Sequence, residues 1–374
     1  MTPTAPDARE AIVTPSTRLD ADLLLSVTTT ILRSAGMTDS DADVLADSLV
    51  TADATGVSTH GLTRLSPYVA QLRSGQVNPR PAEKELSEST SALLVDADGG
   101  FGAPVGIRVL DRLMDKAQDS GVAFGGVTRV AHFGAAAFFT RYAAERGFLA
   151  LAMSSTSPSV VPFGGRGPRI GNSPMSFAAP GRAAPELVAD MAQSMSSRGR
   201  IKLFHRERRP LPPGWAVDAH GVPTTDAGAA LEGGVLPSGG HKGTALSLIV
   251  EMLASGLTGA HLTQDIRHAG FTSAGTPDLT ADVTVGNAYL VLDADVFGSA
   301  PEVRRRASSI ADHVRASEPA EGVEAVLAPG DPERIHAERA RTEGIALAAG
   351  TVQSIRALAD DLGVALPHAL AVAA

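Results

Sequence analysis

The sequence predicts an α/β protein that begins with a helical lobe, and three observations support this. The first 80 or so residues carry only helical patterns, with apolar side chains recurring every three to four positions. From about residue 91 onward, short apolar runs typical of strands alternate with amphipathic helices. The glycine motif of a dinucleotide-binding Rossmann unit occurs only in an imperfect form. We therefore expect helices first and a mixed α/β region after them.

The helical lobe is predicted from three consecutive amphipathic segments. Gly36 and Gly56 stand where the first two should end, as C-caps do. His60 lies at the start of the third, where free backbone N–H groups and the helix dipole favour an anion. The segments are 19–37, 39–56 and Leu62 to about Arg73.

The α/β region is predicted from strand-like and helical runs in alternation. Strand-like runs lie within residues 91–102, 122–130, 148–156 and 286–297, and the stretch 186–197 begins like a strand. Helical runs lie at 107–121, 134–147 and 242–259, and the segment 331–364 reads as two helices around a short apolar turn.

Composition excludes several classes of protein. A chain of 374 residues with 44% hydrophobic and 20% charged residues fits a globular protein of two or three lobes. A net charge of −9 argues against binding to nucleic acid or to a membrane surface. The absence of cysteine excludes disulfides, thiolate metal sites and cysteine nucleophiles, and it fits a cytoplasmic protein. Residues 1–18 are polar and rich in proline and threonine, so we expect a disordered leader there.

Most familiar site motifs are missing. The stretch GGFGAPVG spaces Gly100, Gly102 and Gly106 one residue too widely for a Rossmann fingerprint, so a plain glycine turn into a helix is favoured. There is no phosphate-binding P-loop, no G-x-S-x-G, and no spacing of histidines or carboxylates that predicts a metal site. In PSGGHKGTAL, Lys242 follows two glycines at a helix start, which suits either a bound phosphate or a simple helix N-terminus. A lone histidine such as His132 is more often structural than catalytic.

Seven blocks in order resemble the malate/L-lactate dehydrogenase type 2 family, a group of NAD(P)-dependent enzymes. This group includes ureidoglycolate dehydrogenase, 2,3-diketo-gulonate reductase, sulfolactate dehydrogenase and Δ1-piperideine-2-carboxylate reductase. The likeness runs from about residue 20 to 350. The blocks are STHGLTRLSPYVAQLRSGQVNP, AHFGAAAFF, SPSVVPFGG, GNSPMSFAAP, VADMAQS, PPGWAVDAHGVPTTD and GGHKGTALSLIVEMLASGLTGA.

The resemblance implies a particular fold and assembly. It implies a non-Rossmann α/β fold with a mixed, largely antiparallel sheet, and a helical lobe formed by the two chain ends. We accordingly expect a lobe of residues 19–80 joined by 333–374, and a central α/β region over 81–332 that includes the nucleotide-binding part. It also implies a homodimer with each active site near the subunit interface.

The resemblance further implies roles for individual residues. His60 matches the family's proton donor or acceptor, and Arg64 matches the residue that binds the substrate carboxylate. An imidazole suits proton transfer near neutral pH, and a guanidinium suits a carboxylate. On a helix the two would share one face. His132 matches a second proposed catalytic histidine, and Asp190 matches an aspartate with catalytic and cofactor-binding roles.

Other positions are expected to contact the substrate or the cofactor, which is NAD or NADP. Thr59 and Asn172 fall in the substrate-binding blocks, although Thr59 replaces a usual serine and Asn172-Ser173-Pro174 replaces a usual Thr-Asn-Pro. Val130 and Ala131 stand where the family commonly has a polar pair before His132. The expected cofactor-binding residues are Thr156, Val188, Asp190, Met191, Ala192, Ser194, His241, Lys242, Gly330 and Asp331.

A basic stretch has two readings. Residues 198–209 carry six cations, which form either a solvated loop or a site for the extra phosphate of NADP. The second reading favours NADPH as the cofactor. The six are Arg198, Arg200, Lys202, Arg206, Arg208 and Arg209.

Three functions remain open from the sequence. The leading hypothesis is an NAD(P)-dependent oxidoreductase that transfers a hydride to or from a small 2-oxo or 2-hydroxy carboxylic acid. A close alternative is a reductase of cyclic imines that carry a carboxylate next to the C=N bond, which would use the same arginine and histidine. A non-catalytic nucleotide-binding subunit is the alternative from another class, and the presence of His60, Arg64 and Lys242 speaks against it.

Overall fold

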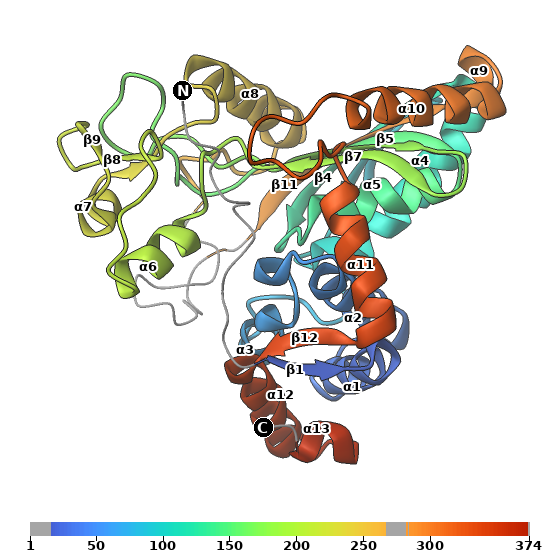
Figure 1. Cartoon of the computed structure of the whole chain (residues 1–374). Helices are drawn as coiled ribbons and strands as arrows, with labels where there is room; N and C mark the ends of the chain where they lie inside the picture. Colours follow the sequence, from blue (N-terminus) through green and yellow to red (C-terminus); the bar gives the residue numbers. More distant parts are fainter. Residues whose placement is uncertain (1–15, 267–281, 283, 373–374) are drawn as a thin grey trace.

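A computed structural model describes residues 16–266, 282 and 284–372. A large central sheet lies above a helical lobe built from both ends of the chain, and a smaller lobe with its own short strands lies to one side (Figure 1). None of the described helices is long and apolar enough to cross a membrane.

The central sheet has seven strands in the order β2-β3-β4-β11-β5-β6-β7. Only β3 and β4 pair in parallel, and every other neighbouring pair is antiparallel, so the expected mixed and largely antiparallel sheet is confirmed. The strands are β2 (Lys84–Glu88), β3 (Ala92–Asp96), β4 (Val122–Val130), β5 (Phe148–Ser154), β6 (Met175–Pro180), β7 (Pro185–Met191) and β11 (Val285–Asp293).

Helices pack against this sheet because their apolar faces need cover. Leu110 and Leu113 of α4 are fully buried, and so are Phe139 of α5 and Tyr289 of β11, which belong to the same core cluster. The helices of this region are α4 (Gly102–Ser120), α5 (Ala136–Glu145), α8 (His241–Glu251), which continues as η3 (Met252–Gly256), α9 (Ala294–Phe297) and α10 (Ala300–Arg315).

The lower lobe joins the two chain ends through a two-stranded sheet (Figure 1). In it, β1 (Ser16–Leu19) pairs antiparallel with β12 (Ile345–Ala348). One apolar core contains residues from both ends, such as Leu24 and Ile355. The helices here are α1 (Ala21–Ser34), α2 (Asp39–Ala54), α3 (Leu65–Ser74), α11 (Asp331–Glu343), α12 (Ala349–Leu362) and α13 (His368–Val372), with the short turns η1 (Ser58–His60) and η2 (Leu62–Arg64) before α3.

The side lobe has a small core of its own around Ile201 and Phe204. It contains α6 (Arg198–Arg206), α7 (Ala227–Glu232) and the three-stranded sheet β10-β8-β9, formed by Gly234–Val235, Ala216–Val217 and Pro223–Thr224.

Two expectations need correction. Residues 16–18 are not part of a disordered leader, because they form most of β1 and bond to β12, a partner more than 300 residues away that no local pattern reveals. Residues 1–15 of that expected leader lie outside the described residues. The basic stretch begins as a helix rather than a loop, since α6 is capped by Ser197 and buries Ile201 and Phe204.

Candidate active site

His60 and Arg64 lie in two short turns that lead into α3. Backbone bonds from His60 N to Val57 O (2.9 Å) and from Arg64 N to Gly61 O (2.9 Å) close these turns. The expected single helix around both residues is wrong, because Gly61 between them is extended. Their proximity therefore comes from a folded connection and not from helical spacing.

Asp53 at the end of α2 holds this connection in place. Its Oδ2 accepts a hydrogen bond from Leu62 N at 2.7 Å, which caps the second turn. Gly61 lies so close that an added Cβ would fall 2.3 Å from the carboxylate atoms. Burial raises the pKa of the Asp53 carboxyl to about 7, although the Leu62 N–H opposes the shift. The sequence did not single out Asp53, which reads there as one of several acidic residues on a helix.

The side chain of Arg64 is fixed by the backbone of the first turn. Its Nε donates to Thr59 O at 2.7 Å, while Thr59 Oγ1 lies 3.1 Å from His60 Nδ1. Burial and then the charge of Arg64 lower the pKa of His60 to about 4. The structure thus brings Thr59, His60 and Arg64 together, with His60 neutral at pH 7.

His132 joins this group from the loop between β4 and α5. Its ring stacks on that of His60, with centroids 5.8 Å apart and planes 17° apart. Burial, followed by the charges of Arg64 and His60, holds the pKa of His132 well below its usual value. Its Nδ1 lies 2.6 Å from the hydroxyl of Tyr68, a buried α3 residue that sequence patterns mark only as part of the core. The two histidines predicted from separate blocks therefore share one site.

A second group forms where three loops meet beyond the sheet. Gln193 N donates to Asn172 O at 2.7 Å, and Ser238 N donates to Gln193 O at 2.9 Å. Ser194 bridges to Pro237, and Ser173 N donates to Thr156 Oγ1 at 3.4 Å. Backbone bonds thus connect the segments that contain Asn172 and Ser194 with the loop that leads to Lys242, and the Thr156 side chain joins them through Ser173 N.

That loop ends at the N-terminus of α8 with no side-chain cap. Gly239 and Gly240 both adopt φ of +63°, a conformation that favours glycine and lets the chain turn sharply. His241 and Lys242 follow them, both exposed, and Lys242 forms no ion pair within the described part of the chain. Nearby, Gln193 Nε2 is buried with no hydrogen-bond partner among the described residues. A cation, an uncapped helix start and an unused amide donor fit an anionic, amide-bearing group such as a nicotinamide dinucleotide.

Asp190 lies near the end of β7, between the two groups. Its Oδ2 accepts from Ala137 N at 3.0 Å, so it caps α5, the helix that follows the His132 loop. Met191 and Ala192 come next and are exposed. The segment therefore links the histidine site to the loops beside α8.

The remaining expected cofactor residues lie in a different environment. Val188 is buried beside Ala137 and Ala178 in a small apolar cluster. Asp331 is 2% exposed, and its carboxylate accepts from Ala328 N and from Arg315 and Arg334. Gly330 packs against the backbone of Val188. The side chains of Val188 and Asp331 are thus engaged by the protein, which leaves the backbone of this loop for any contact with a cofactor.

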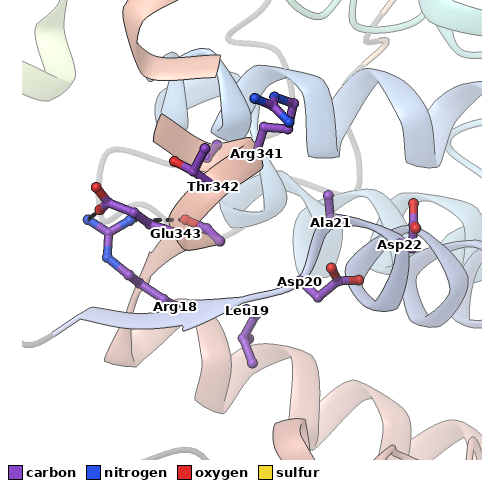
Figure 2. A pocket seen from close by; sticks show the side chains of 10 residues that line it. Arg18, Leu19, Asp20, Ala21, Asp22, Arg341, Thr342 and Glu343 are labelled. Carbon is purple, nitrogen blue, oxygen red and sulfur yellow. Dashed lines mark hydrogen bonds and ion pairs between the residues drawn. The ribbon is translucent and has the colours of Figure 1, made fainter. Parts of the chain in front are cut away.

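A cavity of about 440 Å³ lies away from all these residues. It opens between the start of α1 and the end of α11, and its lining includes Arg18, Asp20 and Glu343 (Figure 2). Figure 2 also shows the ion pair between Arg18 and Glu343, 3.0 Å long, which lies at the edge of this cavity. Among the described residues, no group of three or more histidine or acidic side chains is placed to hold a metal ion.

Comparisons with known proteins agree with this arrangement. Residues 19–356 match the model of the malate/L-lactate dehydrogenase family. A Δ1-pyrroline-2-carboxylate/Δ1-piperideine-2-carboxylate reductase of Pseudomonas putida is 33% identical over 357 residues, which cover 95% of this chain and 99% of that protein. A ureidoglycolate dehydrogenase (NAD+) of Escherichia coli is 32% identical over 311 residues, or 85% of this chain and 89% of that one.

Solved structures show the same likeness. Sulfolactate dehydrogenase from Methanocaldococcus jannaschii superposes with a TM-score of 0.86 and 30% identity. The match covers 94% of this chain and 98% of that one.

Proposed function

The chain belongs to the malate/L-lactate dehydrogenase family and is an oxidoreductase of that family, and from this premise we propose the reaction it performs. It transfers a hydride between a nicotinamide cofactor and the 2-carbon of a small 2-oxo or 2-hydroxy carboxylic acid. The observation that supports this most strongly is the grouping of Arg64, His60 and His132, two neutral imidazoles beside a permanent cation.

Each member of the group has a distinct part in the proposed reaction. Arg64 binds the substrate carboxylate, with its guanidinium oriented by the bond from Nε to Thr59 O. Neutral His60 accepts the hydroxyl proton when a 2-hydroxy acid is oxidised, and the imidazolium formed in this way is the proton donor in the reverse direction. His132 contributes a hydrogen bond to the same substrate oxygen. The nicotinamide supplies only the hydride chemistry.

Further residues position the cofactor and the substrate. Lys242, His241 and the uncapped start of α8 hold the phosphates, while Thr156, Ser194 and the Asp190–Ala192 segment contact the rest of the cofactor. The backbone at Val188, Gly330 and Asp331 also contacts the cofactor, since Gly330 packs against Val188, two residues before Asp190. Asp190 also orients the His132 loop through its cap on α5, and Asn172 contacts the substrate.

We expect NADPH to bind more tightly than NADH. The helix α6 begins at Arg198, four positions after Ser194, so its cations follow closely on the cofactor segment. Arg200 is partly engaged over Trp215, at 5.4 Å, and Arg209 lies over Phe204, at 4.7 Å, whereas Arg206 and Arg208 are exposed. Fluorescence titration of the protein with both cofactors tests this, and equal affinities would contradict it.

A cyclic imine reductase is the second candidate function. It is favoured by the imine reductase of Pseudomonas putida, which matches nearly the whole chain. Arg64 would bind the ring carboxylate in the same way, and a histidine would donate to the imine nitrogen.

One turnover assay separates the two candidate functions. Purified protein is mixed with NADH or NADPH and with pyruvate, oxaloacetate, sulfopyruvate or Δ1-piperideine-2-carboxylate, and loss of the reduced-nicotinamide absorbance is followed. We expect turnover with at least one of them, and the preferred class identifies the function. His60→Ala is expected to lower kcat by about 100-fold or more, because it removes the proton-transfer group. A variant as active as the parent would contradict the role of His60.

We also propose that the chain forms a homodimer through the outer face of α8 and the residues after it. Several large apolar side chains there are exposed, which is unusual for a surface that faces only water. They are Leu246, Leu248, Ile249, Met252 and Leu257.

A further inference from the structure

Tyr68 is the only tyrosine among the three in the chain that contacts a site histidine. It is 3% exposed, and its ring packs on Phe101 with centroids 4.5 Å apart. Its hydroxyl lies 2.6 Å from His132 Nδ1. The ring of Tyr68 packs on Phe101 without using the hydroxyl, so the contact between the hydroxyl and His132 is separate from this packing.

A second contact decides the direction of the bond between Tyr68 and His132. The backbone N–H of Gly134 points at the same Nδ1, at 3.3 Å. A backbone N–H can only donate, so Nδ1 must present its lone pair. Tyr68 then donates as well, and the single imidazole proton lies on Nε2. If Nδ1 carried the proton instead, the Gly134 N–H would lose its acceptor.

The charge states of both residues agree with this arrangement. Burial raises the pKa of Tyr68 to about 12, so the phenol keeps the proton that it donates. His132 stays neutral because burial and the nearby Arg64 and His60 lower its pKa. Its Nε2 makes no hydrogen bond within the described part of the chain.

We propose that Tyr68 is a positioning residue that holds His132 in the tautomer with its proton on Nε2, so that this nitrogen is a hydrogen-bond donor to the substrate. The inference rests on the proposed function. In that reaction, Nε2 of His132 donates a hydrogen bond to the substrate oxygen or nitrogen that is protonated when the neighbouring carbon receives the hydride. A neutral imidazole of fixed tautomer polarises a C=O or C=N bond without needing to be charged.

Tyr68→Phe tests the proposal, because it removes one oxygen and leaves the ring on Phe101. We expect kcat to fall about tenfold or more, since His132 then spends time in the wrong tautomer. KM for substrate and the melting temperature should change little. Tyr142→Phe is the matched control, because its hydroxyl donates only to Asp111, at 2.7 Å, and it should leave kcat unchanged.

A spectroscopic measurement tests the same point without turnover. In protein labelled with ¹⁵N-histidine, a nitrogen with a proton and one without resonate far apart, and His132→Gln identifies the signals of His132. We expect an unprotonated Nδ1 and a protonated Nε2 in the parent, and a mixture of tautomers in Tyr68→Phe.

Two results would overturn the inference. One is a proton on Nδ1 of His132 in the parent, and the other is a Tyr68→Phe variant that keeps both the parental kcat and the parental tautomer. If instead the parent turns over none of the acids or imines, the proposed function fails, while the ¹⁵N spectra still decide whether Tyr68 fixes the tautomer.

Discussion

The geometry around Arg64 makes even lysine a poor replacement for it. Its Nε is anchored to Thr59 O, and a guanidinium presents a planar fork that an ammonium lacks. We expect Arg64→Lys to raise KM for the carboxylate substrate about 10- to 100-fold, because a charge-assisted bidentate interaction is lost. Arg73→Lys near the end of α3 is the control, since Arg73 pairs with the exposed Asp361 at the surface. Steady-state kinetics measure KM for both variants, and an unchanged KM in Arg64→Lys would contradict the role of Arg64 in binding the carboxylate.

His60 should remain neutral far below the pH at which histidine usually titrates. Burial and the Arg64 charge lower its pKa to about 4, so the basic form persists from neutral pH down to that value. Oxidation of a 2-hydroxy acid with His60 as the base should therefore not slow as the pH falls through 6.5. In Arg64→Gln the second cause of the shift is gone, and the pKa should rise.

An NMR titration of labelled histidine checks this, with His60→Gln to assign the signal. A midpoint of 6.5 or above for His60 in the parent would contradict the prediction.

The connection formed by η1 and η2 depends on a carboxyl group from another helix. Asp53 is protonated more readily in the folded protein, with its pKa raised from 3.8 to about 7, than in the unfolded chain. Its contribution to stability is therefore fully present below pH 3.8 and is lost as pH rises through 7. A shift of this size corresponds to as much as about 4 kcal/mol.

Asp53→Asn should remove that pH dependence, because an amide oxygen still accepts from Leu62 N but never ionises. We expect the variant to match the parent near pH 4 and to melt at a higher temperature at pH 8. Thermal unfolding at pH 4.5, 6 and 8 measures the difference between the two proteins. If the difference in melting temperature between parent and variant does not change with pH, folding does not raise the pKa of Asp53.

The elements show where sequence patterns succeed and where they fail. Amphipathic periodicity predicts α1 and α2 closely, and it predicts α4 from Ile107 onward, although α4 begins at Gly102 where every side is buried. It does not predict the break at Gly61, since that depends on Asp53 across the fold. The place of β11 between β4 and β5 has no local signal either, because strands more than 130 residues apart meet only after the chain folds.

The candidate site shows the same division. The family resemblance predicts His60, Arg64 and His132 as site residues, and the three lie together. Tyr68, Asp53 and Gln193 were missed, because each acts through a partner distant in sequence or through the lack of one. Sequence alone indicates which side chains have suitable chemistry, whereas their hydrogen-bond partners need coordinates.

The exposed apolar surface of α8 bears on how the complete chain assembles. Leu248 and Ile249 are 51% and 54% exposed, and Met252 in the next turn is 59% exposed. Such a cluster is stabilised when a second copy covers it, since burial of apolar area contributes about 25 cal/mol per Å². If charged side chains replaced these apolar ones, they would be buried between the two copies without partners of opposite charge.

We therefore expect the parent to be a dimer in solution and the double variant Leu248→Glu, Ile249→Glu to be a monomer. Light scattering after size-exclusion chromatography measures both masses. Ile310→Glu is the matched control, because Ile310 on α10 is equally exposed, at 56%, but lies outside the cluster. If Ile310→Glu also separates the copies, the interface is not specific to α8, and if the double variant stays a dimer, the copies meet through another face. A monomeric parent would show that this apolar face does not pair two copies of the chain.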